Sequence, residues 1–315
     1  MKVCIIGMGL IGGSMALALR EKGIASAVIG VDANPLHRRQ ALELGLADEM
    51  RELDAAVAEA GLVILAVPVN AVGELLRQIL PQVNQQVIMD TGSTKQQVCA
   101  SANACVNRNR FVATHPMWGT EHSGPAAAVA NAFVNKAAVI CNKEQSDPDA
   151  VALTERIYTA LGMHLLYMEA AAHDLHAAYV SHISHITSFA LANTVLEKEK
   201  EEDAIFELAS GGFESTVRLA KSNPAMWVPI FQQNKENVLD VLNEHISQLR
   251  KIKSCLEKEN FDYLRQLIEH ANEAIYIVQD GYVRMANPRS AEITGYSEQE
   301  ILNQPFTLFV HPDDR

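Results

Sequence analysis

The residues best suited to chemistry lie in two polar loops that each follow an apolar run. One loop reads DTGSTK (residues 90–95) and the other reads HPMWGTEHSG (residues 115–124). An imidazole with a pKa of about 6.5 can accept a proton from an alcohol while hydride leaves the same carbon. His115 is therefore a candidate general base, and Ser93 a candidate to bind the same hydroxyl or to orient the ring. Taken alone, the loop fits a purely structural histidine equally well.

A glycine-rich turn near the N-terminus forms a second candidate site. Gly7, Gly9 and Gly12 follow an apolar strand pattern with the spacing G-x-G-x-x-G and open a helical pattern. The first glycine permits a tight bend, the second lets backbone approach a pyrophosphate, and the third lets the helix pack on the strand. Free N–H groups at the helix N-terminus attract the phosphates. The turn predicts a dinucleotide site that also includes Leu10 and Ile11.

Asp32 indicates which nicotinamide cofactor this turn suits. It directly follows the apolar run 27–31 and lies about 20 residues beyond Gly12, the usual distance in this motif. A carboxylate there hydrogen-bonds the ribose hydroxyls of NAD and would repel the 2′-phosphate of NADP. We therefore expect NAD. Arg38 and Arg39 follow closely enough to soften that preference, or else face solvent on the next helix.

The elements that must position these loops alternate along the first part of the chain. Helical patterns separate six apolar runs typical of strands, at residues 3–6, 27–31, 62–67, 87–90, 111–113 and 137–141. This alternation predicts a Rossmann-type α/β domain over residues 1–149, a parallel sheet covered by helices on both faces. Ligands bind at the carboxyl ends of the strands in such sheets, where the candidate loops fall. Val67 and Pro68, at the end of one run, are expected to line the nicotinamide-bound ribose.

The pattern changes after residue 150, where we find no convincing strand. Helical periodicities cover residues 150–161, 173–196, 203–209, 226–256 and 260–271. We therefore expect an all-α domain over residues 150–267. The helix at 173–196 is apolar on most sides, which favours burial against a second copy of the chain and hence a homodimer through this domain. His173 and His176 are interpreted as residues of a helix surface.

A third pattern begins near residue 268. Two strands of a hairpin are predicted on either side of a turn at Asp280 and Gly281, and residues 287–294 then read as a helix. The stretches NPRSAEITGY and HPDDR resemble the first half of a PAS sensor domain. Because the other strands of such a sheet are absent, we interpret residues 268–315 as a partial PAS-like α+β segment and not as an independent sensor.

The composition argues against several classes of protein. The chain has 315 residues, 48% of them hydrophobic and 20% charged, as in ordinary soluble globular proteins. Its net charge of −12 argues against a general nucleic-acid-binding surface. The apolar run at 61–69 is too short to cross a bilayer, and the N-terminus shows no export signal. We expect a cytoplasmic protein with neither nucleic-acid nor membrane partners.

Five motifs, in this order and spacing, resemble the prephenate dehydrogenase family of tyrosine biosynthesis over about residues 1–265. They are GMGLIGGS (7–14), DTGSTK (90–95), HPMWGTEHSG (115–124), SHISH (181–185) and GGFESTVRLAKSNPAMW (211–227). The resemblance implies oxidative decarboxylation of prephenate to 4-hydroxyphenylpyruvate with reduction of NAD. It also implies a small-molecule substrate bound between a Rossmann domain and a helical dimerisation domain.

The resemblance assigns roles to single residues as well. It implies that His115 contacts the ring hydroxyl and helps to remove its proton, that Ser93 lies beside it, and that Arg218 holds a substrate carboxylate. The other residues implied at the substrate pocket are Thr120, Glu121, Ser181, His182, His185 and Trp227. No metal is expected at His182 and His185, because no further ligand stands at a suggestive spacing.

Two other functions stay open on the sequence. The first is arogenate dehydrogenase, whose substrate carries an amine in place of the side-chain keto group. The second is a signalling protein that binds a nicotinamide nucleotide without turnover and reports through its tail. The presence of Ser93, His115 and Arg218 argues against the signalling protein. The second histidine of the SHISH motif resembles the prephenate-using members more than the arogenate-using ones.

Overall fold

The computed structural model describes residues 1–200, 205–271, 276–279 and 282–309. Two compact units are distinguished, Met1–Leu242 and Asn243–Arg315. All the candidate site residues belong to the first unit. No helix in the described ranges is both long enough and apolar enough to pass through a bilayer.

The first unit is built on an eight-stranded sheet with the order β3-β2-β1-β4-β5-β6-β7-β8. The strands are β1 (Lys2–Ile6), β2 (Ala27–Val31), β3 (Glu49–Met50), β4 (Leu62–Leu65), β5 (Val87–Asp90), β6 (Phe111–Pro116), β7 (Ala137–Cys141) and β8 (His164–Met168). Neighbouring strands are parallel except β6 and β7, which are antiparallel. The predicted Rossmann-type sheet is confirmed, with this one reversal.

The reversal at β7 follows from its connection. A parallel pair needs a crossover, usually a helix, whereas residues 117–136 between β6 and β7 contain only the short 3₁₀ turn Pro125–Ala127. The chain therefore returns beside β6 in the opposite direction. Helix α6 (Pro148–Ala160) then provides the crossover from β7 to the parallel strand β8.

Strand β8 corrects the prediction that no strand follows residue 150. Its residues HLLYM pair with β7 from Ala137 opposite His164 to Cys141 opposite Met168. Gly162, with φ of +78°, ends the preceding helix and lets the chain turn into the sheet. Because β8 lies at the edge, its residues are only partly buried and show none of the continuous burial of the central strands. The sheet therefore continues to Met168.

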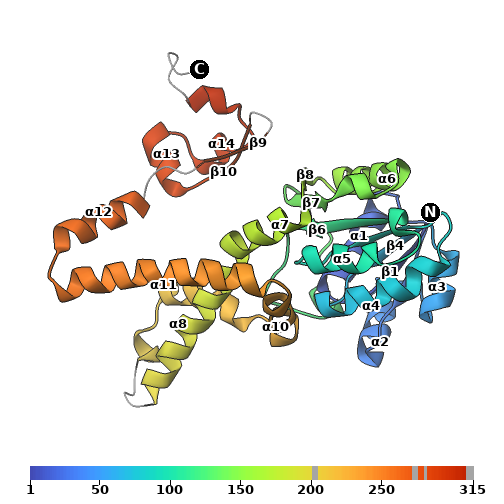
Figure 1. Ribbon diagram of the computed structural model, residues 1–315, viewed down its shortest axis with the longest axis horizontal. Helices are drawn as coiled ribbons and strands as arrows, with labels where there is room; N and C mark the ends of the chain where they lie inside the picture. Colours follow the sequence, from blue (N-terminus) through green and yellow to red (C-terminus); the bar gives the residue numbers. More distant parts are fainter. Residues whose placement is uncertain (201–204, 272–275, 280–281, 310–315) are drawn as a thin grey trace. The chain divides into compact units, whose positions relative to one another are not determined.

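Helices cover both faces of the sheet (Figure 1). The alternation of side chains along each strand fixes two apolar layers, since Val3 and Ile5 enter one and Cys4 and Ile6 the other. The first layer is covered by α1 (Leu10–Glu21), α2 (Pro35–Glu43) and α6. The second is covered by α3 (Leu53–Glu59), α4 (Val69–Ile79) and α5 (Gln96–Asn103).

The remaining part of the first unit is helical, as predicted, but its long helices are interrupted. The range 173–196 divides into α7 (Ala170–Ala177), a π-helical turn (Ala178–His182) and α8 (Ile183–Glu199). The range 226–256 breaks at Asn234, between α10 (Pro224–Gln233) and α11 (Lys235–Glu257). The other elements are the 3₁₀ turns Phe206–Leu208 and Arg218–Lys221 and α9 (Gly211–Val217). Residues 203 and 204 of the predicted helix 203–209 lie outside the described residues.

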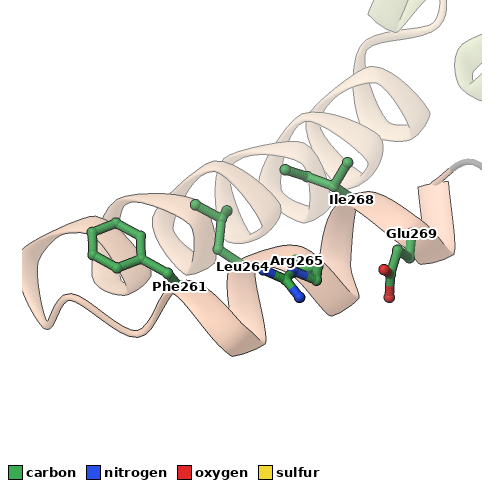
Figure 2. A pocket seen from close by; sticks show the side chains of 5 residues that line it. All are labelled: Phe261, Leu264, Arg265, Ile268 and Glu269. Carbon is green, nitrogen blue, oxygen red and sulfur yellow. The ribbon is translucent and has the colours of Figure 1, made fainter.

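The second unit begins within α11 and contains α12 (Phe261–Ala271), β9 (Tyr276–Gln279), β10 (Tyr282–Ala286), α13 (Pro288–Thr294) and α14 (Glu298–Ile301). The predicted hairpin is confirmed, because β9 and β10 pair antiparallel. Its predicted turn at Asp280 and Gly281 lies outside the described residues. Figure 2 shows the side chains that line a shallow hollow along α12, namely Phe261, Leu264, Arg265, Ile268 and Glu269.

Candidate active site

The turn between β1 and α1 has a geometry that requires glycine. Gly7 has φ of +94°, and its N–H donates to the carbonyl of Val31 over 2.8 Å. A Cβ on Gly12 would lie 1.9 Å from the Gly7 carbonyl oxygen, so a side chain there would push α1 away from the turn. A Cβ on Gly9 would meet no heavy atom within 4 Å. The space before the first turn of α1 is therefore open, as a bound pyrophosphate requires.

The other residues predicted to contact the nucleotide border the same turn. Leu10 and Ile11 are half-buried at the start of α1. Val67 packs beside the turn, since its Cγ1 would lie 3.0 Å from a Cβ on Gly7. Pro68 is exposed at the N-cap of α4. All of them lie at the carboxyl ends of β1 and β4, which are neighbours in the sheet.

Asp32 is held against the glycine turn. Its Oδ2 accepts the N–H of Met8 over 2.8 Å, and its Oδ1 accepts the N–H of Asn34 over 2.8 Å. The Nδ1 atom of His37 lies 3.4 Å from Oδ2. A carboxylate offers about four acceptor positions, so these contacts orient Asp32 and leave acceptor capacity for the hydroxyls of a ribose. The turn and the carboxylate together fit a dinucleotide.

The two arginines that follow Asp32 differ in their surroundings. The Arg38 guanidinium lies 3.5 Å from the Asp32 carbonyl oxygen and 3.3 Å from a carboxylate oxygen of Glu52. Arg39 is exposed. The Arg38 guanidinium thus already contacts two oxygen acceptors within the protein.

His115 is buried on β6 and belongs to a chain of hydrogen bonds. It is 8% exposed, and its Nδ1 lies 2.8 Å from the Nε2 of His173. The Nδ1 of His173 lies 2.8 Å from Oδ1 of Asp174. The Asp174 carboxylate also accepts the backbone N–H groups of Lys95, over 2.7 Å, and Gln96, over 2.9 Å. The interpretation of His173 as a surface residue is wrong: it is 2% exposed and contacts the candidate base.

The loop that carries Ser93 is fixed by a buried ion pair. The Lys95 ammonium contacts the Asp90 carboxylate, and both side chains are fully buried. The same carboxylate accepts the backbone N–H of Thr114 over 3.0 Å, which ties the end of β5 to β6 directly before His115. Ser93 is half-buried in this loop. Among the hydrogen bonds of the described residues, none joins Ser93 to His115.

His182 and His185 lie around the junction of the π-helical turn and α8. His182 is 1% exposed, and its Nδ1 accepts from the side-chain amide of Asn234 over 3.1 Å. The same amide nitrogen donates to the Asp174 carbonyl over 2.6 Å. The His185 ring stacks on Trp227 with centroids 3.5 Å apart, and its Nδ1 lies 3.1 Å from the carbonyl oxygen of Ser181. In the described structure the buried indole N–H of Trp227 has no hydrogen-bond partner.

Arg218 forms an ion pair with Glu121 across 97 residues of sequence. One guanidinium nitrogen lies 3.0 Å from a Glu121 carboxylate oxygen, and Arg218 is 52% exposed. A hydrogen bond from its own backbone, together with the charge of Arg218, lowers the pKa of Glu121. The hydroxyl oxygen of Thr120 accepts the N–H of His122 over 3.2 Å. The loop after β6 therefore contacts the helical part beside an accessible guanidinium.

Mutual electrostatic effects connect the candidate residues. Burial, and then the nearby His173, Lys95 and His182, hold the pKa of His115 well below its usual value. Burial is also the main cause that lowers the pKa of His182 to about 4, and His185 contributes to it. Burial lowers the pKa of His185, and Arg218 adds to the shift. His115 is therefore uncharged at neutral pH. The pKa shifts also link neighbouring residues in series, since His182 acts on His115, His185 acts on His182, and Arg218 acts on His185.

Besides the misinterpreted His173, four residues of this network were not predicted as site residues: Asp90, Lys95, Asp174 and Asn234. Each satisfies buried backbone groups or buried side chains from another element. A weak signal existed for Asp174, since a carboxylate directly follows His173 on a helix near the SHISH motif. The sequence contains no such signal for Asn234, because its role depends on the break between α10 and α11.

An open sheet of this strand order, with a glycine turn after β1 and an acidic residue after β2, defines the Rossmann class of dinucleotide-binding proteins. Within that class, the chain belongs to the prephenate dehydrogenase family. Residues 15–167 match the family model for the nucleotide-binding domain of prephenate dehydrogenase, and residues 169–270 match the model for its dimerization domain. Residues 262–315 match a PAS domain model. Both resemblances predicted from the motifs are confirmed.

Individual relatives agree with this assignment. A prephenate dehydrogenase of Bacillus subtilis is 32% identical over 275 residues, covering 86% of this chain and 74% of the relative. A cyclohexadienyl dehydrogenase of Zymomonas mobilis is 31% identical over 275 residues, covering 86% and 93%. A crystal structure of the A. aeolicus prephenate dehydrogenase with hydroxyphenyl propionate and NAD+ is 30% identical, with a TM-score of 0.79 and coverage of 86% and 95%.

Proposed function

We propose that this chain converts prephenate to 4-hydroxyphenylpyruvate by oxidative decarboxylation, with NAD as the oxidant, in tyrosine biosynthesis. The observation that carries the proposal is the buried, uncharged imidazole of His115 at the carboxyl end of β6. It lies on the same edge of the sheet as the glycine turn. Membership of the prephenate dehydrogenase family supports this substrate and this reaction.

His115 and Ser93 act on the ring hydroxyl of the substrate. Nε2 of His115 accepts the hydroxyl proton as hydride leaves the carbon that bears this oxygen. NAD, when bound, supplies the acceptor for that hydride. The bond between the ring and its carboxylate then breaks, carbon dioxide leaves, and the electron pair of that bond makes the ring aromatic. The proton held by His115 returns to the oxygen, so that atoms and charge balance.

The protein's main contribution to this reaction is positioning. Gain of aromaticity makes the overall step strongly downhill, so the protein need only align the reacting carbon and place charge correctly. The Asp90–Lys95 ion pair supports this role, because it fixes the Ser93 loop against the strand that carries His115. Ser93 and His115 can therefore hold their relative positions before the substrate binds.

Arg218 binds a carboxylate of the substrate. Its guanidinium is half exposed and has five N–H donors, so a substrate carboxylate can bind while Glu121 retains one of them. Such a cation is needed because the substrate is a dianion and the chain has a net charge of −12. Thr120, Ser181, His182, His185 and Trp227 complete the proposed pocket.

The glycine turn and Asp32 hold the cofactor in this proposal. The open space at Gly9 would accept the pyrophosphate, and the turn formed by Gly7, Leu10, Ile11 and Gly12 would hold it. The remaining acceptor positions of Asp32 bind the adenosine ribose and disfavour a 2′-phosphate. Val67 and Pro68 line the other end of the cofactor. NAD is therefore preferred over NADP.

We further propose a cytoplasmic homodimer formed through the helical domain. Because β8 extends the sheet to Met168, we move the first predicted boundary from residue 149 to residue 168 and propose domains at residues 1–168, 169–267 and 268–315. The match of residues 169–270 to a dimerization domain supports this assembly. So do two exposed apolar side chains of α12, Phe261 and Ile268, which line the hollow shown in Figure 2 together with Leu264 and the charged Arg265 and Glu269. Side chains of this kind favour burial against another surface.

Two alternative functions can be tested, an arogenate dehydrogenase and a signalling protein that binds the nucleotide without turnover. An arogenate dehydrogenase of Synechocystis with a known crystal structure is 27% identical to this chain, which keeps the arogenate alternative open. Initial rates of NADH formation, measured with prephenate and with arogenate at matched concentrations, distinguish all three functions. We expect the larger kcat/KM with prephenate. A larger value with arogenate would reassign the substrate, and binding of NAD with no NADH from either compound would favour a signalling protein.

A further inference from the structure

The proposed reaction assigns no role to His173 and Asp174, yet these two residues continue the path of hydrogen bonds behind His115. The path runs from His115 Nδ1 to His173 Nε2 over 2.8 Å and from His173 Nδ1 to Asp174 Oδ1 over 2.8 Å. We propose that His173 and Asp174 are positioning residues that hold the His115 imidazole in the tautomer whose Nε2 is unprotonated. The inference rests on the proposed function, in which that nitrogen accepts the substrate proton.

The direction of each bond follows from the Asp174 end. Its two carboxylate oxygens already accept the backbone N–H groups of Lys95 and Gln96, so the carboxylate acts purely as an acceptor. His173 must therefore donate from Nδ1. In a neutral His173 the lone pair then lies on Nε2, which obliges His115 to donate from its own Nδ1. The lone pair of His115 is thereby left on Nε2, the nitrogen that faces away from His173.

The opposite protonation state would disable the base. A His173 with protons on both nitrogens would donate to Nδ1 of His115, and the hydrogen of the neutral His115 ring would move to Nε2. That ring could not accept a proton from a hydroxyl. Asp174 therefore acts through His173, in the same way that a buried carboxylate fixes the tautomer of a catalytic histidine in other enzymes.

The path is also rigidly anchored. His173 and Asp174 lie on α7, whereas the two N–H groups that fix Asp174 belong to the start of α5 and the loop before it. The carbonyl of Asp174 accepts from Asn234, which also binds His182. One dipeptide of α7 thus orients side chains from the sheet and from the helical part. His173 and Asp174 are each at most 2% exposed, so no water competes for these bonds.

Charged and titratable groups surround His115. His173, with its partner Asp174, lies on α7, and His182 lies in the π-helical turn. Lys95 lies in the loop after β5, and its partner Asp90 ends that strand. When His115 takes up the substrate proton, the negative charge of Asp174 stabilises the cation that forms across the two imidazoles. Loss of that charge therefore weakens His115 as a base and moves the acid limb of its pH profile to lower pH.

Steady-state kinetics of the full-length chain test this inference. We expect Asp174→Asn to lower kcat by about 10²- to 10⁴-fold, with the acid limb of kcat/KM at lower pH. The KM for prephenate and the Kd for NAD should change by less than about threefold, because the bonds of the Asp174 carboxylate are to His173, Lys95 and Gln96 and not to Arg218 or the glycine turn. Asp54→Asn, which alters an exposed carboxylate of α3, is the matched control and should match the wild type.

A pair of His173 variants gives an answer even if Asp174→Asn does not fold. His173→Gln keeps an acceptor oxygen near the position of Nε2 and should retain much of the activity, whereas His173→Met removes it and should lose at least 10²-fold in kcat. The inference would be overturned if His173→Gln and His173→Met had the same kcat as each other and the pH profile of the wild type. Failure of the proposed function is distinguishable, because the wild-type chain itself would then form no NADH from prephenate.

Discussion

Nδ1 of His115 lies 2.8 Å from Nε2 of His173, although 58 residues of sequence separate them. The bond joins the end of β6 to α7, and therefore the sheet to the helical part of the chain. The orientation of the proposed base thus depends on both parts. A nucleotide-binding domain that lacked α7 would leave the buried His115 ring without its only hydrogen-bond partner among the described residues.

Replacing Arg218 with alanine should act mainly on substrate binding. Hydrogen bonds to a charged group contribute about 1.5–3 kcal/mol, so we expect the KM for prephenate to rise about 10- to 100-fold with a smaller change in kcat. Arg77→Ala removes an exposed arginine that pairs with Glu74 on α4, and it should leave KM unchanged. A wild-type KM in the Arg218 variant would contradict the carboxylate role.

The glycine turn can be tested with variants that differ only in where a methyl group is placed. Gly9→Ala should fold normally, because its Cβ would meet no heavy atom within 4 Å, but its affinity for NAD should fall at least about tenfold. Gly61→Ala, whose Cβ would meet nothing closer than 3.9 Å, is the control and should change neither property. Isothermal titration with NAD measures the effect. Undiminished affinity of Gly9→Ala would exclude the turn as the pyrophosphate site.

Burial of His182 makes the stability of the fold depend on pH. Its pKa is lowered from 6.5 to about 4, mainly by burial, so the unfolded chain binds a proton in this range that the folded chain does not. The free energy of unfolding should therefore fall as the pH decreases from 6.5 to about 4, with a contribution of about 3 kcal/mol from this residue. Urea unfolding at pH 7 and pH 4.5 measures the change.

The variant His182→Asn isolates this contribution, since its stability should decrease less between the two pH values than that of the wild type. His176→Asn alters an exposed histidine of α7 and should show the wild-type dependence. If His182→Asn and the wild type lose the same free energy on acidification, His182 is not the source of the effect.

The C-terminal segment should be dispensable for turnover. Every residue of the proposed site lies between Gly7 and Trp227, whereas the PAS model begins to match at residue 262. A chain shortened after Ala271 should therefore form NADH at the rate of the full-length chain. Circular dichroism checks that the shortened chain is folded. A folded but inactive shortened chain would show that the tail contributes to the reaction.

The sequence predicted the central sheet well because its signals are local. A glycine turn such as that at Gly7 and Gly12 leaves a direct trace in residue type, and so do buried parallel strands. The reversal of β7 was not predicted, because the apolar run itself carries no information about strand direction; the direction depends on the connection at residues 117–136, which contains no crossover helix. Strand β8 was missed because HLLYM is too short to be distinguished from the end of a helix by periodicity.

The site was predicted only where its residues belong to a local sequence motif. Motif residues such as His115 and Arg218 were recognised from the sequence motifs that contain them and from the resemblance of these motifs to a family. His173 was misinterpreted because a histidine in an alanine-rich helix gives no indication of which face is packed. Its burial depends on the contact of α7 with β6 and α5, which are distant in sequence. The residues that orient a base were thus harder to find than the base itself.

The turnover of prephenate by His115→Asn tests most directly whether His115 is the catalytic base. The asparagine amide can still donate to His173 but cannot accept the substrate proton, so the variant separates the structural role from the chemical one. With His176→Asn as the control, we predict that kcat falls by about 10²- to 10⁴-fold while the Kd for NAD stays near the wild-type value. A near-wild-type kcat in His115→Asn would show that His115 is not the base.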